Sequence, residues 1–207
     1  MDKIILKPRR EESILRYHPW VFSGAVEEIV GSPAEGDLVS VVSHDGKPLA
    51  CGHYQIGSIS VRILSFDEDP TREDFWHLML SRAYKLREAC NLTDSPLTNC
   101  YRLVHGEGDG LPGLIIDYYN GVCVLQAHSV GMFRAKASIA RALREVYGSR
   151  LKAVYDKSSG TAPFKAGLDL VDGYLFKADG FDEEELAVLE NGHKFVVNWG
   201  EGQKTGF

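Results

Sequence analysis

The residues of this chain best suited to contact a nucleic acid stand near its N-terminus. Between positions 7 and 22, basic side chains are mixed with aromatic rings beside a proline. Cations neutralise phosphates and an exposed ring can stack on a base, so this combination is typical of RNA-binding surfaces. Burial of at least one of the rings in a small barrel is the alternative. The candidate RNA-binding residues here are Lys7, Arg9, Arg10, Arg16, His18 and Trp20.

Basic and acidic residues are segregated along the chain. The formal net charge is −6, which argues mildly against a nucleic-acid partner. Residues 134–157, however, carry seven basic and two acidic side chains, whereas residues 179–201 carry one basic and seven acidic ones. Such asymmetry can steer a phosphate backbone to one face, so Arg134 and Arg141 join the candidates. An ordinary solvated helix face explains the basic run equally well.

A glycine-rich run at 106–113 reads Gly-Glu-Gly-Asp-Gly-Leu-Pro-Gly. Its last six residues match by count the spacing of a dinucleotide-binding loop, in which a helix N-terminus receives the phosphate. The residues that follow, 114–119, predict a strand and not a helix. We therefore expect a β-hairpin loop at this position rather than a cofactor loop.

Near the end of the chain an amide, a cation and a hydroxyl stand between glycines. Gln203, Lys204 and Thr205 can together hold a nucleotide or a phosphate, although the pattern is a weak signal. No paired carboxylates or Ser/His/Asp arrangement stand out, and the four cysteines and seven histidines match no metal-ligand spacing. We predict reduced thiols, no metal site and no catalytic residue in this chain.

The length and composition are those of a globular protein with one large or two small domains. The 207 residues are 44% hydrophobic and 25% charged. No apolar run approaches the ~20 residues of a membrane helix, and the N-terminus lacks the features of a signal peptide. We expect a cytoplasmic protein without a membrane partner.

Short strands dominate the first third of the chain. Turn signals separate five apolar runs, which predicts a small barrel or sandwich. Asp-Glu-Asp-Pro at 67–70 then ends this block, and apolar residues at helical spacing over 72–90 predict a connecting helix. The expected strands are 4–6, 20–22, 37–42, 49–54 and 59–64.

The second block combines strands with one amphipathic helix. Apolar residues recur at helical spacing over 131–147, and Gly148 is a helix stop. Asn-Gly pairs at 120–121 and 191–192 predict hairpin turns. We expect a mixed α+β fold whose second domain is of β-β-α-β-β type, with strands at 101–105, 114–119, 122–127, 151–155, 187–190 and 194–197.

Three motifs taken together resemble a known family. The first is His-Pro-Trp-Val-Phe-Ser-Gly at 18–24, and the second is Arg-Leu-Val-His-Gly-Glu-Gly-Asp-Gly-Leu-Pro-Gly-Leu-Ile-Ile-Asp at 102–117. The third is Glu-Asn-Gly at 190–192, followed by Gly-Gln-Lys-Thr-Gly-Phe at 202–207. In this order, over nearly the whole chain, they are similar to the RlmI-type bacterial 23S rRNA cytosine-5 methyltransferases.

The resemblance implies a division of the chain into parts. A PUA domain, which is a small RNA-binding β-barrel, is expected at 1–70, a connecting helix and linker at 71–98, and a middle α+β domain at 99–200. Residues 201–207 are then the truncated start of a Rossmann-like domain that binds S-adenosylmethionine. The rest of that domain, absent from this chain, would hold the catalytic cysteine beyond Phe207.

The function implied is the RNA-recognition part of an S-adenosylmethionine-dependent rRNA methyltransferase that makes 5-methylcytosine in 23S rRNA. In such enzymes a cysteine thiolate attacks the base and makes its carbon 5 nucleophilic. We expect the intact protein to be an enzyme. This chain alone is expected to be inactive and to bind no cofactor. The alternatives left open are a free-standing RNA-binding module and a scaffold that forms a homodimer.

Overall fold

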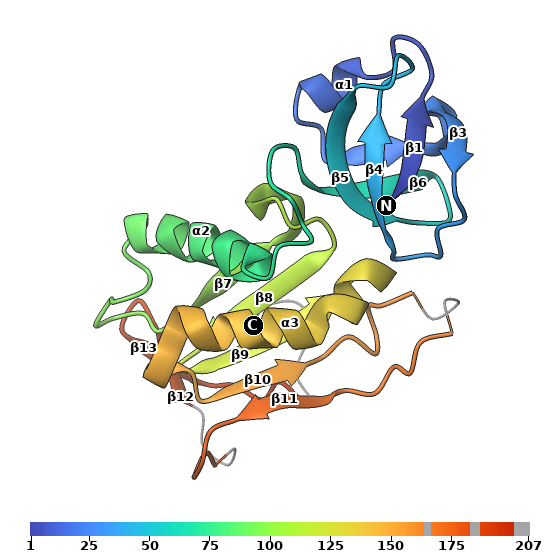
Figure 1. Cartoon of the computed structure of the whole chain (residues 1–207). Coiled ribbons are helices and arrows are strands. Elements are labelled where there is room, and N and C mark those ends of the chain that lie inside the picture. The colour runs from blue at the N-terminus through green and yellow to red at the C-terminus, as the bar shows by residue number, and fades with distance from the viewer. Residues whose placement is uncertain (164–166, 183–186, 201–207) are drawn as a thin grey trace.

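The computed structural model describes residues 1–163, 167–182 and 187–200. Two β-sheets follow each other along the chain, and α2 (Phe75–Ala89) leads from the first to the second. Figure 1 shows the first sheet at the upper right and the second sheet below it, crossed by α2 and α3 (Val130–Tyr147). The expected mixture of helices and strands is confirmed.

The first sheet curls into a small barrel with the strand order β2-β6-β5-β4-β1-β3 (Figure 1). Alternate residues of its strands point inward, as the pleat of a strand requires, and Val39, Val41, Val61 and Ile63 are buried there. The short helix α1 (Glu12–Leu15) adds the buried Ile14. The strands are β1 (Asp2–Leu6), β2 (Trp20–Phe22), β3 (Val26–Val30), β4 (Leu38–Val42), β5 (Pro48–Tyr54) and β6 (Ile59–Ser65).

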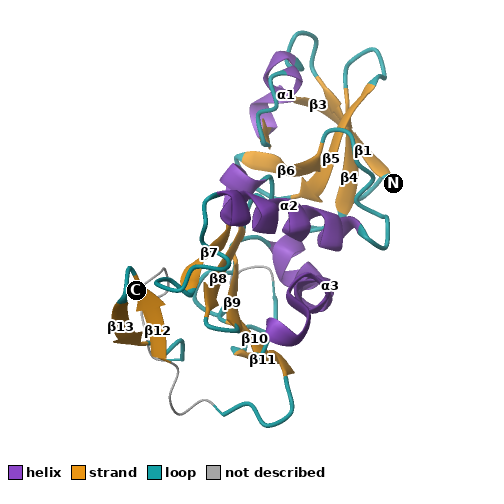
Figure 2. Cartoon of the chain, turned by 90° about the vertical axis from the view of Figure 1, so that its left-hand side faces the viewer, coloured by secondary structure: helices purple, strands orange, loops and turns teal. Residues whose placement is uncertain are grey.

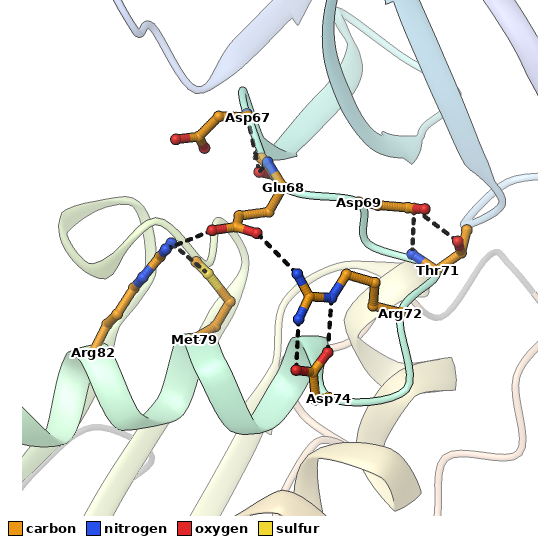
Figure 3. A network of polar contacts seen from close by, with 9 residues as sticks. Asp67, Glu68, Asp69, Thr71, Arg72, Asp74, Met79 and Arg82 are labelled. Atoms are coloured by element: carbon orange, nitrogen blue, oxygen red, sulfur yellow. Dashed lines mark hydrogen bonds and ion pairs between the residues drawn. The ribbon is translucent and has the colours of Figure 1, made fainter.

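An ion-pair network holds the linker between the two sheets (Figure 3). Glu68 accepts a hydrogen bond from Arg82 of α2 at 2.7 Å and lies 3.6 Å from Arg72. Arg72 in turn donates twice to Asp74, at 2.9 and 2.7 Å. The helix α2 begins at Phe75, directly after this network and three residues later than the helical spacing predicts.

The second sheet has the strand order β11-β10-β9-β8-β7. Only β9 and β10 run parallel, and α3 supplies the crossover between them. Three strands precede the helix, so the succession is β-β-β-α-β-β. The three strands predicted before the helix are all present, and only the expected β-β-α-β-β label is wrong by one strand. The strands are β7 (Cys100–His105), β8 (Leu114–Tyr119), β9 (Val122–Ala127), β10 (Ala153–Asp156) and β11 (Gly173–Lys177).

The second sheet is covered on both faces. Helices α2 and α3 pack side by side on one face, as Figure 2 shows from the side, and Cys123 and Leu125 of β9 are buried beneath them. Val122 and Val124 of the same strand face the other way, toward a cluster that contains Trp199. The hairpin of β12 (Ala187–Glu190) and β13 (His193–Val196) pairs as a separate two-stranded sheet beside β7.

Local sequence signals explain where the main elements of the second sheet start and stop. Asn120 and Gly121 both have positive φ, 44° and 102°, as the predicted Asn-Gly hairpin turn requires. The Ser129 hydroxyl accepts a hydrogen bond from the Met132 N–H at 3.4 Å and caps α3. Gly148 ends the helix with φ 57°, as predicted. No helix in the described part of the chain is long and apolar enough to cross a membrane.

Candidate nucleic-acid interface

Three aromatic rings gather at β2, the edge strand of the barrel. Trp20 and Phe22 are two residues apart, so their side chains leave the strand on the same face. Their ring centroids are 6.0 Å apart, and the His18 ring lies 5.9 Å from Trp20 and 5.8 Å from Phe22. The Trp20 backbone N–H donates to His18 Nδ1 at 3.2 Å. Trp20 is half-buried, whereas Phe22 remains 47% exposed.

This aromatic group meets the glycine-rich loop of the second sheet. Trp20 Nε1 donates a hydrogen bond to Glu107 Oε1 at 2.9 Å, and Arg62 Nη1 of β6 donates to the same oxygen at 3.3 Å. The Arg62 guanidinium also lies 5.6 Å from the centroid of the Trp20 ring. Two motifs that stand far apart in sequence therefore form one surface. We call His18, Trp20, Phe22, Arg62 and Glu107 the junction seam.

The loop that carries Glu107 is held from behind by a buried ion pair. Residues Gly106–Asp109 form a short 3-10 helix between β7 and β8, which pair antiparallel, so the predicted hairpin loop is confirmed. Arg87 of α2 donates to both Asp109 oxygens, with Nη2 to Oδ2 at 2.7 Å. Oδ2 also accepts the His105 N–H at 2.6 Å. The two charged side chains are only 12% and 3% exposed, so the loop is fixed in place.

A histidine at the end of β9 lies among the charges near the seam. Burial, and then the positive charge of Arg62, lower the pKa of His128 below its usual value, and the charge of Glu107 opposes this shift. Its Nε2 is buried and makes no hydrogen bond to the described residues. Arg102, which lowers the same pKa, is itself neutralised by Asp117 through hydrogen bonds of 2.8 and 3.1 Å.

The predicted N-terminal cations lie on the barrel, and one of them, Lys7, is bonded near the seam. Lys7 Nζ donates to the carbonyl oxygen of Gly24 at 3.0 Å, two residues beyond Phe22. Arg9 and Arg10 are exposed and make no ion pair within the described part of the chain. Arg16 lies 3.9 Å from a carboxylate oxygen of Glu12, and both side chains are largely exposed. Contact of these cations with RNA stays a prediction.

The basic run of α3 is partly neutralised by acidic partners. Arg134 donates to Asp37 of the barrel at 3.0 Å, and Lys136 donates to the buried Asp156 at 2.7 Å. Arg141 is exposed and lines a hollow of about 580 Å³ at the far end of the helix. Neither Arg134 nor Arg141 contacts the junction seam. The net charge of 134–157 therefore overstates the cations that this helix offers to a ligand.

A second contact between the barrel and the second sheet is buried and closely packed, and we call it the dry contact. The His53 ring of β5 is 6% exposed and lies against Gly131 of α3, where a Cβ atom would overlap it. Gly36 has φ 89°, and a Cβ there would stand 2.8 Å from Val130 Cγ1. Burial, and then the charge of Arg134, lower the pKa of His53 to about 4, so the ring is neutral. This dry contact sets the orientation of the barrel.

Three residues of the seam, Phe22, Arg62 and Glu107, were not among the RNA-binding residues predicted from the sequence. Arg62 is the only charged residue in the apolar strand Ile59–Ser65, and that isolation was the signal available. Glu107 stands inside the glycine-rich run 106–113, where only the spacing of the glycines was considered. The predicted entrance residues Gln203, Lys204 and Thr205 lie outside the described residues. Within the described ranges, the cysteines are free thiols and no cluster of metal-ligating side chains occurs.

Comparison with known protein families identifies one part of the chain. Residues 4–66 match the PUA-like domain. The chain also aligns over 99% of its length with the ribosomal RNA large subunit methyltransferase I of Shewanella amazonensis, at 41% identity, and with that of Escherichia coli, at 36%. It spans about half the length of these curated relatives, 51% in both cases.

Solved structures agree with the fold over nearly the whole chain. A protein of Streptococcus mutans assigned to the SAM-dependent methyltransferases superimposes with a TM-score of 0.74, covering 96% of this chain and 49% of its own. A second, assigned as a methyltransferase and solved with SAH, gives a TM-score of 0.75 and covers 96% and 48%. Both are 19% identical. The chain is thus similar in fold to parts of these proteins, and similar in sequence to half of the rRNA large subunit methyltransferases.

Proposed function

We propose that this chain is the RNA-recognition part of an S-adenosylmethionine-dependent rRNA methyltransferase, and that the intact protein forms 5-methylcytosine in 23S rRNA. The similarity in sequence to ribosomal RNA large subunit methyltransferases supports the substrate class. The PUA-like match of residues 4–66 supports the barrel as an RNA-binding unit. In this proposal RNA is bound jointly by two parts of the chain. One is the barrel with its linker, and the other is the second sheet.

The observation that carries the proposal is the junction seam with the cations beside it. Rings at β2 offer surfaces for bases, and Lys7 with the exposed Arg9 and Arg10 offers charge for phosphates. Because the dry contact at Gly131 fixes the barrel against α3, these groups keep a constant geometry. A constant arrangement of cations and rings favours recognition of a structured RNA.

The described residues do not fit a methyl-donor site. The glycine run at 106–113 lies between antiparallel strands, so no helix N-terminus follows it to receive a cofactor. The buried thiol of Cys123 has a raised pKa because of burial, which disfavours a thiolate nucleophile. We therefore place cofactor binding and methyl transfer in the length of the relatives that this chain does not span, and expect no methyl transfer by the chain alone.

RNA binding is tested by fluorescence anisotropy of the 207-residue chain with 23S rRNA fragments over a series of salt concentrations. We expect affinity to fall steeply with salt, because phosphate contacts release counterions. Replacing Arg9 and Arg10 together by Ala should weaken binding by about 1–3 kcal/mol and flatten the salt dependence. Methyl transfer to rRNA by the chain alone would contradict the assignment of chemistry to another part.

A matched control removes two exposed cations of the second sheet region, Lys85→Ala with Lys194→Ala. This variant has the same net charge as the Arg9/Arg10 variant, so a specific interface predicts a clearly smaller loss of affinity. Equal losses would mean that net charge alone attracts RNA. Binding that does not respond to salt would favour a protein-interaction scaffold instead.

A further inference from the structure

We propose that the junction seam binds a base of single-stranded RNA that has left its own stack. The base stacks on Phe22, and its exocyclic amino group donates a hydrogen bond to Glu107. The inference rests on the proposed function for the kind of ligand, and adds to it a place and a base preference. Neither the PUA-like match nor the similarity to methyltransferases assigns a role to these residues.

Phe22 is an aromatic surface already prepared for stacking. Nearly half of its ring is exposed at an edge strand, where a large apolar side chain gains little from the barrel core. The Trp20 ring stands at 87° to it and the His18 ring at 47°, so the orientation of Phe22 is set by its neighbours. Because the ring is already held in one orientation, it loses little conformational entropy when a base stacks on it.

Glu107 offers a hydrogen-bond acceptor at the Trp20 ring, which is the neighbour of Phe22. Its Oε1 accepts from both Trp20 and Arg62, whereas no hydrogen bond to Oε2 occurs within the described residues. The side chain is 37% exposed, so a ligand can reach the second oxygen. Since the buried pair of Arg87 and Asp109 fixes the loop, this acceptor is held in one place.

The charge of the seam favours a base over a phosphate. Arg62 is balanced by Glu107, and nearby Arg102 is balanced by Asp117. A phosphate would meet a carboxylate oxygen here, whereas Lys7 on the neighbouring loop has no acidic partner in the described ranges. A chain of RNA can therefore place a base in the seam and its phosphates along the N-terminal cations.

The acceptor also predicts which bases bind best. Carboxylates accept hydrogen bonds from the amino group of cytosine, a group that uracil lacks. In uracil the corresponding position is a carbonyl oxygen, which would face the carboxylate without a proton between them. We therefore expect the seam to prefer cytosine over uracil.

The stacking step is tested with fluorescently labelled oligocytidylate and oligouridylate of about ten nucleotides, a length that one small barrel can cover. Phe22→Ala should weaken binding of both by about fivefold or more, the effect of losing one stacked base. Phe22→Leu, which keeps apolar contacts but no aromatic face, should lose nearly as much. The control Ile56→Ala removes an apolar side chain of the barrel that is even more exposed, 69% against 47% for Phe22, and should change nothing.

The acceptor step is tested with Glu107→Gln, which keeps an oxygen for the Trp20 N–H but removes the carboxylate. The amide can also donate to the carbonyl oxygen of uracil, so the preference for cytosine should disappear or reverse. Glu28→Gln removes the same charge from the exposed edge strand β3 and should leave the preference intact. A cytosine preference unchanged in Glu107→Gln overturns this step.

The outcomes separate the two proposals. If the wild-type chain binds no RNA, the proposed function fails, and the seam proposal fails with it. If the wild type binds RNA but Phe22→Ala binds equally well, only the seam proposal is overturned, and the ring group becomes a contact for protein. Unfolding midpoints of all variants, measured in urea, show whether a loss of affinity reflects loss of the fold.

Discussion

The barrel and the second sheet touch at two places that differ in kind. At the dry contact, the His53 ring is buried against Gly131, so closely that a Cβ atom at Gly131 would overlap it. At the junction seam, side chains remain partly exposed, and one oxygen of Glu107 accepts from two donors while the other accepts from none of the described residues. The first contact fixes the orientation of the barrel relative to the second sheet. The second contact leaves aromatic and polar groups accessible to a ligand.

The difference shows how one interface can be both rigid and available. A buried contact without polar partners allows only a narrow range of positions, because interiors are close-packed. An exposed contact made of hydrogen bonds to water-accessible groups contributes little to stability. The rigid contacts therefore lie at α3 and behind the loop, at Arg87. The seam itself contributes little to stability, so its side chains remain available to a ligand.

The largest effect is expected from Arg87→Ala, which removes support from behind the seam. Asp109 would be left buried without its partner, and breaking such a pair costs about 3–5 kcal/mol. Urea unfolding followed by circular dichroism measures the loss. Arg82→Ala on the same helix breaks a more exposed pair with Glu68 and should cost about 1 kcal/mol or less. Similar losses of stability in the two variants would show that burial of the Arg87–Asp109 pair adds nothing to its contribution.

An intermediate effect is expected at the dry contact when the pH is lowered. His53 has a pKa of about 4 in the folded chain, below its usual value of 6.5, so the unfolded chain takes up a proton first. Stability is therefore full above about pH 6.5, falls as the pH drops toward 4, and is constant below. The loss between about pH 7 and about pH 5 should be about 2 kcal/mol.

The measurement compares urea unfolding of the wild type and His53→Gln at the two pH values. His128 titrates in both proteins, so the difference between them isolates His53. A wild type that loses no more stability than His53→Gln would show that the ring becomes protonated within the folded contact, and that the contact is not dry.

The smallest effect is expected at the seam itself. Trp20→Phe keeps a ring but loses the N–H that donates to Glu107, which should cost about 1 kcal/mol or less because the pair is partly exposed. Tyr17→Phe removes an exposed hydroxyl that bonds nothing in the described part of the chain, and should be neutral. A loss of several kcal/mol in Trp20→Phe would make the seam a structural contact and weaken its contrast with His53.

Local sequence signals predicted many of the helices and strands of the fold. The strands 114–119, 122–127 and 187–190 occur as predicted, and α3 begins one residue before the expected 131. The sequence missed β3 and β11, which both lie at sheet edges. An edge strand is little buried, so Val26–Val30 carries two glutamates and no alternation of apolar residues. Its pairing with β1 is decided by the sheet and not by its own pattern.

The sequence by itself determined the elements and the residue types available for RNA, because periodicity, caps and turn residues act over a few positions. It singled out Trp20 and the N-terminal cations, and it rejected a cofactor loop at 106–113. Only the tertiary structure brought Arg62 and Glu107 to Trp20, since contacts between residues 45 or 87 positions apart leave no local pattern. The same packing paired Arg134 and Lys136 with acids from other elements, and so removed cations that the charge pattern had offered.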